Sequence, residues 1–174
     1  MSILKWLFLA ALFLSTSLFG GVAKVALLKG EAAVERDGKN IVLKNGDTLE
    51  EKDSIKTSKD TQIQLIFEDS TVITLGSESD FKIQEYLNES GNQKAKFKFN
   101  QGAFKTITGK IGKSAPQNFT LETKTATIGI RGTHFTVIAG ADGNSRVYCT
   151  FGAISVSSQG KESSVAQGFY VSVA

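Results

Sequence analysis

The chain has 174 residues, of which 41% are hydrophobic, with 20 lysine and arginine side chains against 17 acidic ones. A chain of this length and composition can bury one substantial core, which excludes an intrinsically disordered protein. One cysteine, Cys149, excludes an intramolecular disulfide, and one histidine, His134, excludes a multi-histidine metal site. We therefore expect a protein that holds no metal and no other cofactor.

Residues 1–23 have the pattern of a secretory signal peptide. Their one charged residue, Lys5, precedes an apolar run over residues 6–14 that is too short to span a bilayer. The small residue Ala23 suits the cleavage site, and an uncleaved membrane anchor is the alternative. After cleavage, residues 24–174 are expected to be periplasmic or secreted, without a membrane span.

The exported part has the alternation of β-strands. Within residues 61–67, for example, Ile63, Leu65 and Phe67 fall on one face and two glutamines on the other. The segment Asp80–Asn88 fits either a strand or a helix, and we favour the strand. Turns are expected at Asp37-Gly38, Asn45-Gly46, Glu68–Ser70, Gln101-Gly102 and Asp142–Asn144, whose residue types suit tight turns.

These patterns predict an all-β fold with mostly antiparallel strands in a single domain over residues 24–174. The domain is either sandwich-like or a short β-solenoid, with roughly a dozen strands. Glycines at 30, 38 and 46 recur at 152, 160 and 168 with the same spacing. The windows Gly30–Leu49 and Gly152–Val171 therefore predict that the domain begins and ends with similar strand–turn–strand units.

Charge is segregated along the chain. Residues 47–89 hold eleven acidic residues and four lysines, a net charge of −7, whereas residues 92–121 hold six lysines and no acidic residue. These six are a possible binding face: Lys94, Lys96, Lys98, Lys105, Lys110 and Lys113. The face is a solvated strand surface, a contact for anions, or the partner of the acidic segment. Nucleic acid is not expected, because no aromatic residues alternate with the lysines on their face.

No catalytic motif is apparent. Gly109–Ser114 resembles the end of a phosphate-binding loop, but Ile107 stands where that loop requires its first glycine. The single histidine, His134, lies in a strand pattern, which favours a structural role. Cys149 shares a strand face with apolar neighbours and is expected to be buried. We therefore predict no catalytic residue and no enzyme, with a hydrolase as the outside alternative.

The segment Thr125–Val137 is the most specific pattern in the chain. Its core residues are Gly129, Arg131, Gly132, Thr133 and Phe135. This core resembles the hallmark of the FecR domain family, whose members are extracytoplasmic all-β domains. The segments Asp53–Thr57 and Leu65–Ser70 are also similar to the family, although a glycine is usual at the position of Ser70.

The resemblance implies a role in signalling. The founding members are transmembrane regulators that bind a sigma factor in the cytoplasm and receive a signal from an outer-membrane transporter. Here even an uncleaved leader would leave only residues 1–5 in the cytoplasm, so we do not expect direct control of a sigma factor. We expect a stand-alone binding, scaffold or signalling-accessory module that contacts another envelope protein. A binder of an anionic envelope glycan or cell-wall polymer is the alternative.

The core residues of the motif also have a physical interpretation. The guanidinium of Arg131 suits bidentate pairing with a carboxylate, and Gly129 and Gly132 permit a bulge on either side of it. The Thr133 hydroxyl can close the local turn. We expect Arg131 to be either a structural clasp with a buried partner or a contact for a ligand.

Overall fold

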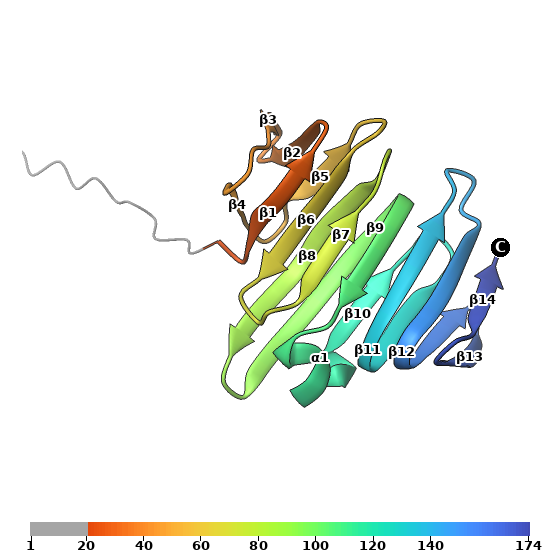
Figure 1. The fold of residues 1–174 in the computed structure, drawn as a ribbon. Coiled ribbons are helices and arrows are strands. Elements are labelled where there is room, and N and C mark those ends of the chain that lie inside the picture. The colour runs from red at the N-terminus through yellow and green to blue at the C-terminus, as the bar shows by residue number, and fades with distance from the viewer. Residues whose placement is uncertain (1–20) are drawn as a thin grey trace, which may run out of the picture.

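The computed structural model describes residues 21–174, which form one open sheet of 14 strands (Figure 1). All strand pairs are antiparallel except β9–β10, so the predicted all-β, mostly antiparallel fold is confirmed. The elements are β1 (Ala23–Lys29), β2 (Ala32–Arg36), β3 (Lys39–Val42), β4 (Thr48–Leu49), β5 (Ser54–Thr57), β6 (Gln62–Phe67), β7 (Val72–Leu75), β8 (Asp80–Glu89), β9 (Asn92–Ile107), α1 (Lys110–Ser114), the 3-10 helix η1 (Pro116–Asn118), β10 (Phe119–Glu122), β11 (Thr127–Ala139), β12 (Ser145–Ser158), β13 (Lys161–Ala166) and β14 (Tyr170–Val173).

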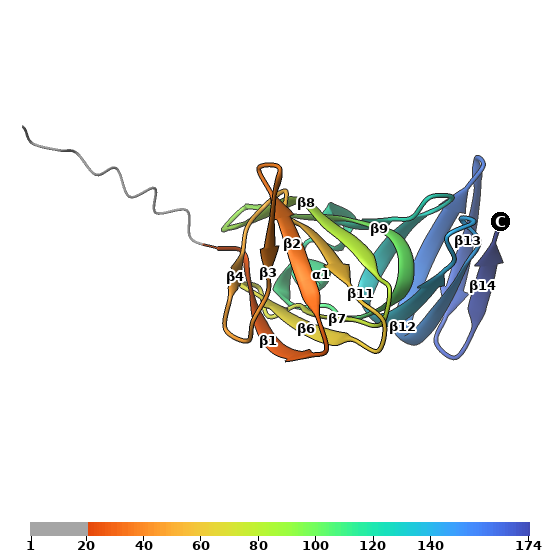
Figure 2. The ribbon, with the colours of Figure 1, turned by 90° about the horizontal axis from the view of Figure 1, so that it is seen from above.

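The sheet folds over itself into two facing layers (Figure 2). Layer A contains, in pairing order, β3, β2, β5, β8, β9, β10, β11, β12 and β13; layer B contains β4, β1, β6, β7, β9, β11, β12 and β14. Three long strands, β9, β11 and β12, belong to both layers. Residues 92–101 of β9 pair with β8 in layer A, and residues 104–107 pair with β7 in layer B.

The core lies between the two layers and is rich in phenylalanine. Phe67 of layer B packs edge-on against Phe97 of layer A, with ring centroids 5.2 Å apart. Phe81 and Phe104 form a second contact across the core at 5.9 Å. Because these rings are almost completely buried, each stabilises the fold by about 1.5–3 kcal/mol relative to an exposed ring.

Long strands change layer at glycines with positive φ. Gly102 in β9, Gly132 in β11 and Gly152 in β12 have φ angles of +103°, +58° and +79°. A side chain at Gly102 would place its Cβ 2.6 Å from the Cα of Ser79. The expected turn at Gln101-Gly102 is therefore wrong. The strand bends there and continues into the other layer, where it pairs with different strands.

The two similar sequence windows form matching units at opposite ends of the sheet, which we call the end units. In each, a tight turn joins two strands of layer A, at Asp37-Gly38 and at Gln159-Gly160. The chain then crosses to a short edge strand of layer B, β4 or β14. The same pair of backbone hydrogen bonds holds this crossing in both units, at 2.8–3.0 Å. In the first unit Val25 accepts from Gly46 and donates to Asp47, and in the second Cys149 accepts from Gly168 and donates to Phe169.

Other local expectations had mixed outcomes. The ambiguous segment Asp80–Asn88 is a strand, as favoured, whereas α1 and η1 were not predicted. The expected leader lies mostly outside the described residues, and its expected boundary, Ala23, is the buried first residue of β1. Within residues 21–174, no helix has the length and apolar character needed to cross a bilayer.

Candidate functional site

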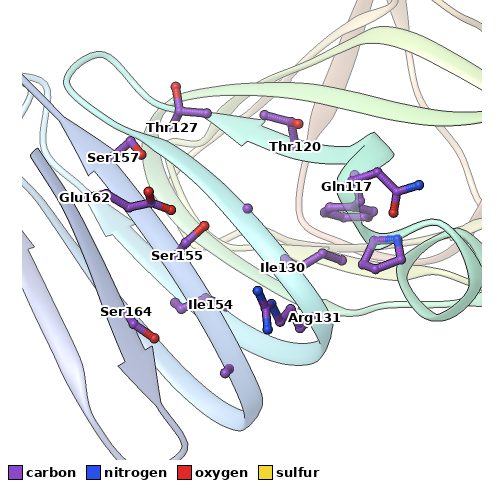
Figure 3. Close-up of a pocket in the computed structure, with 14 residues that line it drawn as sticks. Gln117, Thr120, Thr127, Ile130, Arg131, Ile154, Ser155, Ser157, Glu162 and Ser164 are labelled. Atoms are coloured by element: carbon purple, nitrogen blue, oxygen red, sulfur yellow. The ribbon is translucent and has the colours of Figure 1, made fainter. Parts of the chain in front are cut away.

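A groove of about 480 Å³ lies on the outer face of layer A, over β10–β13 (Figure 3). Its floor follows a cross-strand row in which Thr120, Gly129, Ser155 and Ser164 are successive partners. Gly129 hollows the floor, since a Cβ at this position would lie 2.9 Å from the Ser155 Oγ atom. The groove therefore exists because the row is made of small residues on a twisted sheet.

Charged and amide side chains border this groove. Figure 3 shows Glu162 and Ser164 on β13 at one side, with Gln117 of η1 at the other. Arg131 lies along β11 between them, and its side chain is exposed. Because the lining offers many hydroxyl groups as donors and acceptors, it suits a polar ligand or a polypeptide segment.

Arg131 does not make the expected clasp. Among residues 21–174 its guanidinium takes part in no hydrogen bond and no ion pair, because the side chain points into solvent rather than into the core. The neighbouring Thr133 is buried instead. Its amide donates to the Thr108 hydroxyl at 3.1 Å, and that hydroxyl donates back to the Thr133 carbonyl at 3.0 Å.

The remaining motif residues form the bulge at which β11 changes partner. Before the bulge β11 pairs with β10, up to Gly129, and after it β11 pairs with β9, from His134 onward. Gly132 lies in the bulge and its carbonyl oxygen faces Gly152, while Phe135 packs in the core against Phe104 at 5.8 Å. The motif thus places Arg131 at the groove while its neighbours fix the strand.

An ion pair with a buried carboxylate is made instead by the half-buried Arg36, which was not predicted from the sequence. Its Nε and Nη2 donate to the two carboxylate oxygens of Asp53 at 2.8 and 2.7 Å. Its Nη1 donates to Glu50 at 2.6 Å. The hydrogen bond to Asp53 raises the pKa of Arg36. We call this set the Arg36 clasp; its only signal in the sequence was Asp53, which opens a segment similar to the family.

The predicted lysine face is divided among three places. Lys94, Lys96 and Lys98 lie on the outer face of layer A, Lys105 lies on the outer face of layer B, and Lys110 and Lys113 lie on α1. The structure therefore does not form one face from them, because β9 changes layer at Gly102.

Two of these lysines pair with acidic residues. Lys94 forms an ion pair with Glu85, and Lys96 with Glu122 at 2.9 Å. The hydrogen bond from Lys94 lowers the pKa of Glu85, and the bond to Glu122 raises that of Lys96. Part of the basic segment thus meets the acidic segment within one molecule.

The start of the Gly109–Ser114 segment offers no free amide to an anion within residues 21–174. Strand β9 precedes the segment and α1 lies within it, but the amides of Gly109, Lys110 and Ile111 already have acceptors. The Ile111 amide donates to the buried Asp69 carboxylate at 3.0 Å, and the Gly109 amide donates to Thr71 Oγ1 at 2.9 Å. The same carboxylate accepts from Tyr86, whose pKa is raised by burial and by the charge of Asp69.

Neither the cysteine nor the histidine belongs to a catalytic arrangement in the described part of the chain. Cys149 is buried, as expected, and burial raises the pKa of its thiol. The half-buried ring of His134 packs against Phe151 at 5.1 Å and makes no hydrogen bond within residues 21–174. No three potential metal ligands are grouped anywhere in this range.

The comparisons with known proteins agree with the resemblance seen in the sequence. A family model described as "FecR protein" matches residues 53–155, which is more than half of the chain. The chain belongs to the FecR family. The matched segment begins at Asp53 of the Arg36 clasp and ends at Ser155 in the groove floor, so it includes the Arg131 motif. No curated protein matches the chain.

Two crystal structures of a candidate anti-sigma factor from Parabacteroides distasonis share the FecR fold seen here. They have TM-scores of 0.57 and 0.54, and sequence identities of 16% and 15%. Each alignment covers 68% of this chain and 53% of the other one. This chain therefore spans about half the length of those proteins, and the likeness concerns the fold.

Proposed function

We propose that this FecR-family chain is a non-enzymatic, extracytoplasmic signalling-accessory module that binds another envelope protein in the groove of layer A. The observation on which this proposal rests is the exposed Arg131 guanidinium beside a groove lined with hydroxyl groups. An arginine without an internal partner is available for bidentate pairing with a carboxylate of a bound protein. Membership of a family of regulators supports the signalling role.

A binder of an anionic glycan or cell-wall polymer is the second candidate. The hydroxyl-rich lining with Gln117 and Arg131 would also suit a sugar. Against it, Glu162 brings a negative charge to the groove, and the nearby Lys96 is paired with Glu122. A polymer of repeated negative charge gains little from such a surface, so we favour the protein partner.

Crosslinking in cells tests this proposal. A photoreactive amino acid at Gln117 in the groove wall should form a protein adduct in the envelope fraction, and Arg131→Ala should reduce that adduct severalfold. The same amino acid at Asn144, in an exposed turn away from the groove, is the control. An adduct that only polysaccharide-degrading enzymes remove would favour the glycan, and no difference between the two positions would contradict a groove site.

Export requires a separate test. We expect a C-terminal fusion to a reporter that is active only outside the cytoplasm to be active, and to lose activity when residues 1–23 are deleted. The mass of the exported protein locates the cleavage. Cleavage after Ala23 removes Val22, which bonds to Leu49 and Glu68 at 2.8 and 3.1 Å. Recovery of only the full-length product from the cytosol would contradict the proposed placement.

A further inference from the structure

The outer face of layer B differs in charge from that of layer A. The strand segments that form layer B contain no aspartate or glutamate, and their charged residues are Lys24, Lys29, Lys105 and Arg146. Strands of layer A, in contrast, contain acidic as well as basic residues. The acidic ones include Glu35, Asp80, Glu85, Glu122 and Glu162. Layer B is thus basic along its strands, and the acidic residues near its cations, Glu68 beside Lys24 and Asp142 beside Arg146, lie in the adjoining turns.

Four apolar side chains and the ring of His134 form a row across the same outer face. Successive cross-strand partners on β6, β7, β9, β11 and β12 are Ile66, Val72, Ile107, His134 and Phe151. Ile66, Ile107 and Phe151 are 43%, 41% and 53% exposed. We call these five residues the apolar row. Since neighbouring strands lie about 4.8 Å apart, the row extends about 19 Å across the sheet.

Basic residues share the outer face with the apolar row: Lys24 and Lys105 lie beside the row, and Arg146 lies farther along β12. Lys24 is the cross-strand partner of Ile66 and so stands at one end of the row. Lys105 lies two residues from Ile107 on the same strand face, and Arg146 is the cross-strand partner of the exposed Ile138. None of these cations forms an ion pair within the described part of the chain, unlike Lys94 and Lys96 of layer A.

We propose that the outer face of layer B is a docking surface for a protein segment with an apolar stripe bordered by carboxylates. Burying the apolar row against such a stripe removes half-exposed isoleucine and phenylalanine from water, and the carboxylates neutralise the flanking cations. This surface lies on the opposite face of the molecule from the groove. The proposal therefore does not depend on the groove, and together the two surfaces would let the module contact two partners.

Other occupants fit the face less well. A second copy of this chain would bring Lys24, Lys105 and Arg146 against the same basic residues, and like charges in contact disfavour such a pairing. A bilayer surface would attract the cations. However, the apolar row lies within regular strands at about half exposure, rather than on a protruding loop that could enter the acyl region.

A synthetic peptide pair tests the charge complementarity. One peptide is an amphipathic helix whose leucine stripe is bordered by glutamates, and the other has lysines in place of the glutamates. We expect the acidic peptide to shift the methyl resonances of Ile66, Ile107 and Ile138 in the purified protein, and to bind at least about tenfold more tightly than the lysine peptide. Ile107→Thr replaces a half-exposed apolar side chain of the row with a polar one, and it should weaken binding of the acidic peptide.

Charge-reversal variants locate the binding face. The double variant Lys105→Glu with Arg146→Glu should bind the acidic peptide about tenfold less tightly. The matched control on layer A, Lys82→Glu with Lys98→Glu, should bind it as the parent protein does. Equal binding of both peptides, or equal loss in both double variants, would overturn the proposal. Self-association in sedimentation, or binding to vesicles of phosphatidylglycerol and phosphatidylcholine but not to the peptide, would overturn it as well.

Discussion

Asp53 is buried, and its carboxylate is held mainly by a single side chain, that of Arg36. Arg36→Ala would leave this charge in the interior with the Glu50 amide as its one remaining donor among the described residues. Breaking such a pair costs about 3–5 kcal/mol of unfolding free energy, so we expect a loss of that order. Arg131→Ala removes an exposed side chain and should change stability by about 0.5 kcal/mol or less.

Urea unfolding of the two arginine variants gives this comparison directly. Arg131→Ala serves as the control, because it removes the same chemical group from a strand of the same layer. A large loss of stability in Arg131→Ala with little loss in Arg36→Ala would contradict the assignment of the clasp to Arg36.

Ser70 is held in a left-handed backbone conformation, with φ of +68°. This conformation costs a residue with a Cβ roughly 1–2 kcal/mol, and within residues 21–174 the exposed Ser70 side chain makes no hydrogen bond that offsets the cost. Glycine gains flexibility in the unfolded chain, which removes part of the benefit. We therefore expect Ser70→Gly to stabilise the protein by about 0.5–1 kcal/mol, measured as a higher midpoint in denaturant.

A control for Ser70 is available in Ser58, which is also exposed but does not have positive φ. Ser58→Gly adds backbone freedom without relieving strain, so it should destabilise the protein by roughly 0.5–1 kcal/mol. If both serine variants changed stability in the same direction, backbone strain at Ser70 would not be the cause. The result also bears on the family resemblance, in which glycine is usual at this position.

At the scale of elements, the bend of β9 depends on Gly102. Gly102→Ala would force a side chain into positive φ and place its Cβ 2.6 Å from the Ser79 Cα. Gly160→Ala also forces a side chain into positive φ, at +74°, but has open space around the new Cβ. We expect Gly102→Ala to be the more destabilising variant by about 1–3 kcal/mol in thermal or urea unfolding. Equal effects would mean that the close approach to Ser79 is not limiting.

The contrast between local and distant interactions explains how much the sequence could predict. Strand alternation and the Asp37-Gly38 turn depend on neighbouring residues, so they were correctly predicted. Gly102 looks like a turn residue in the sequence, and only its pairing with strands far along the chain makes it a bend within β9. The Arg36 clasp joins residues 17 positions apart, which no local pattern indicates.

The candidate site was predicted in part for the same reason. The motif around Arg131 was found because its residue types are specific, but the sequence did not show that Arg131 is exposed and that Thr133 is buried. The six lysines were grouped because they are close in sequence, although the layer change of β9 places Lys105 on the opposite face from Lys98. The groove depends on β13 pairing beside β12, which alternation alone does not reveal.

For the whole molecule, the matching end units should differ in local stability. Strand β9 is paired on both sides at residues 95–98 and 104–107, whereas β3 and β13 are each paired on one side only. Only the first end unit has the Arg36 clasp. At the equivalent position of the second unit stands Ser158, whose hydroxyl makes one hydrogen bond, to the Thr125 carbonyl at 2.7 Å.

Native-state hydrogen exchange tests this order of stability. We expect the amides of β9 at residues 95–98 and 104–107 to exchange only through global unfolding, those of β3 faster, and those of β13 and β14 fastest, because fewer interactions must break to open them. Each step of about 1.4 kcal/mol in opening free energy corresponds to a tenfold difference in exchange rate. Arg36→Ala should bring β3 to the rate of β13 without changing β13 itself. If β13 were as protected as β9, or if Arg36→Ala accelerated both end units equally, the clasp would not be the source of the difference between them.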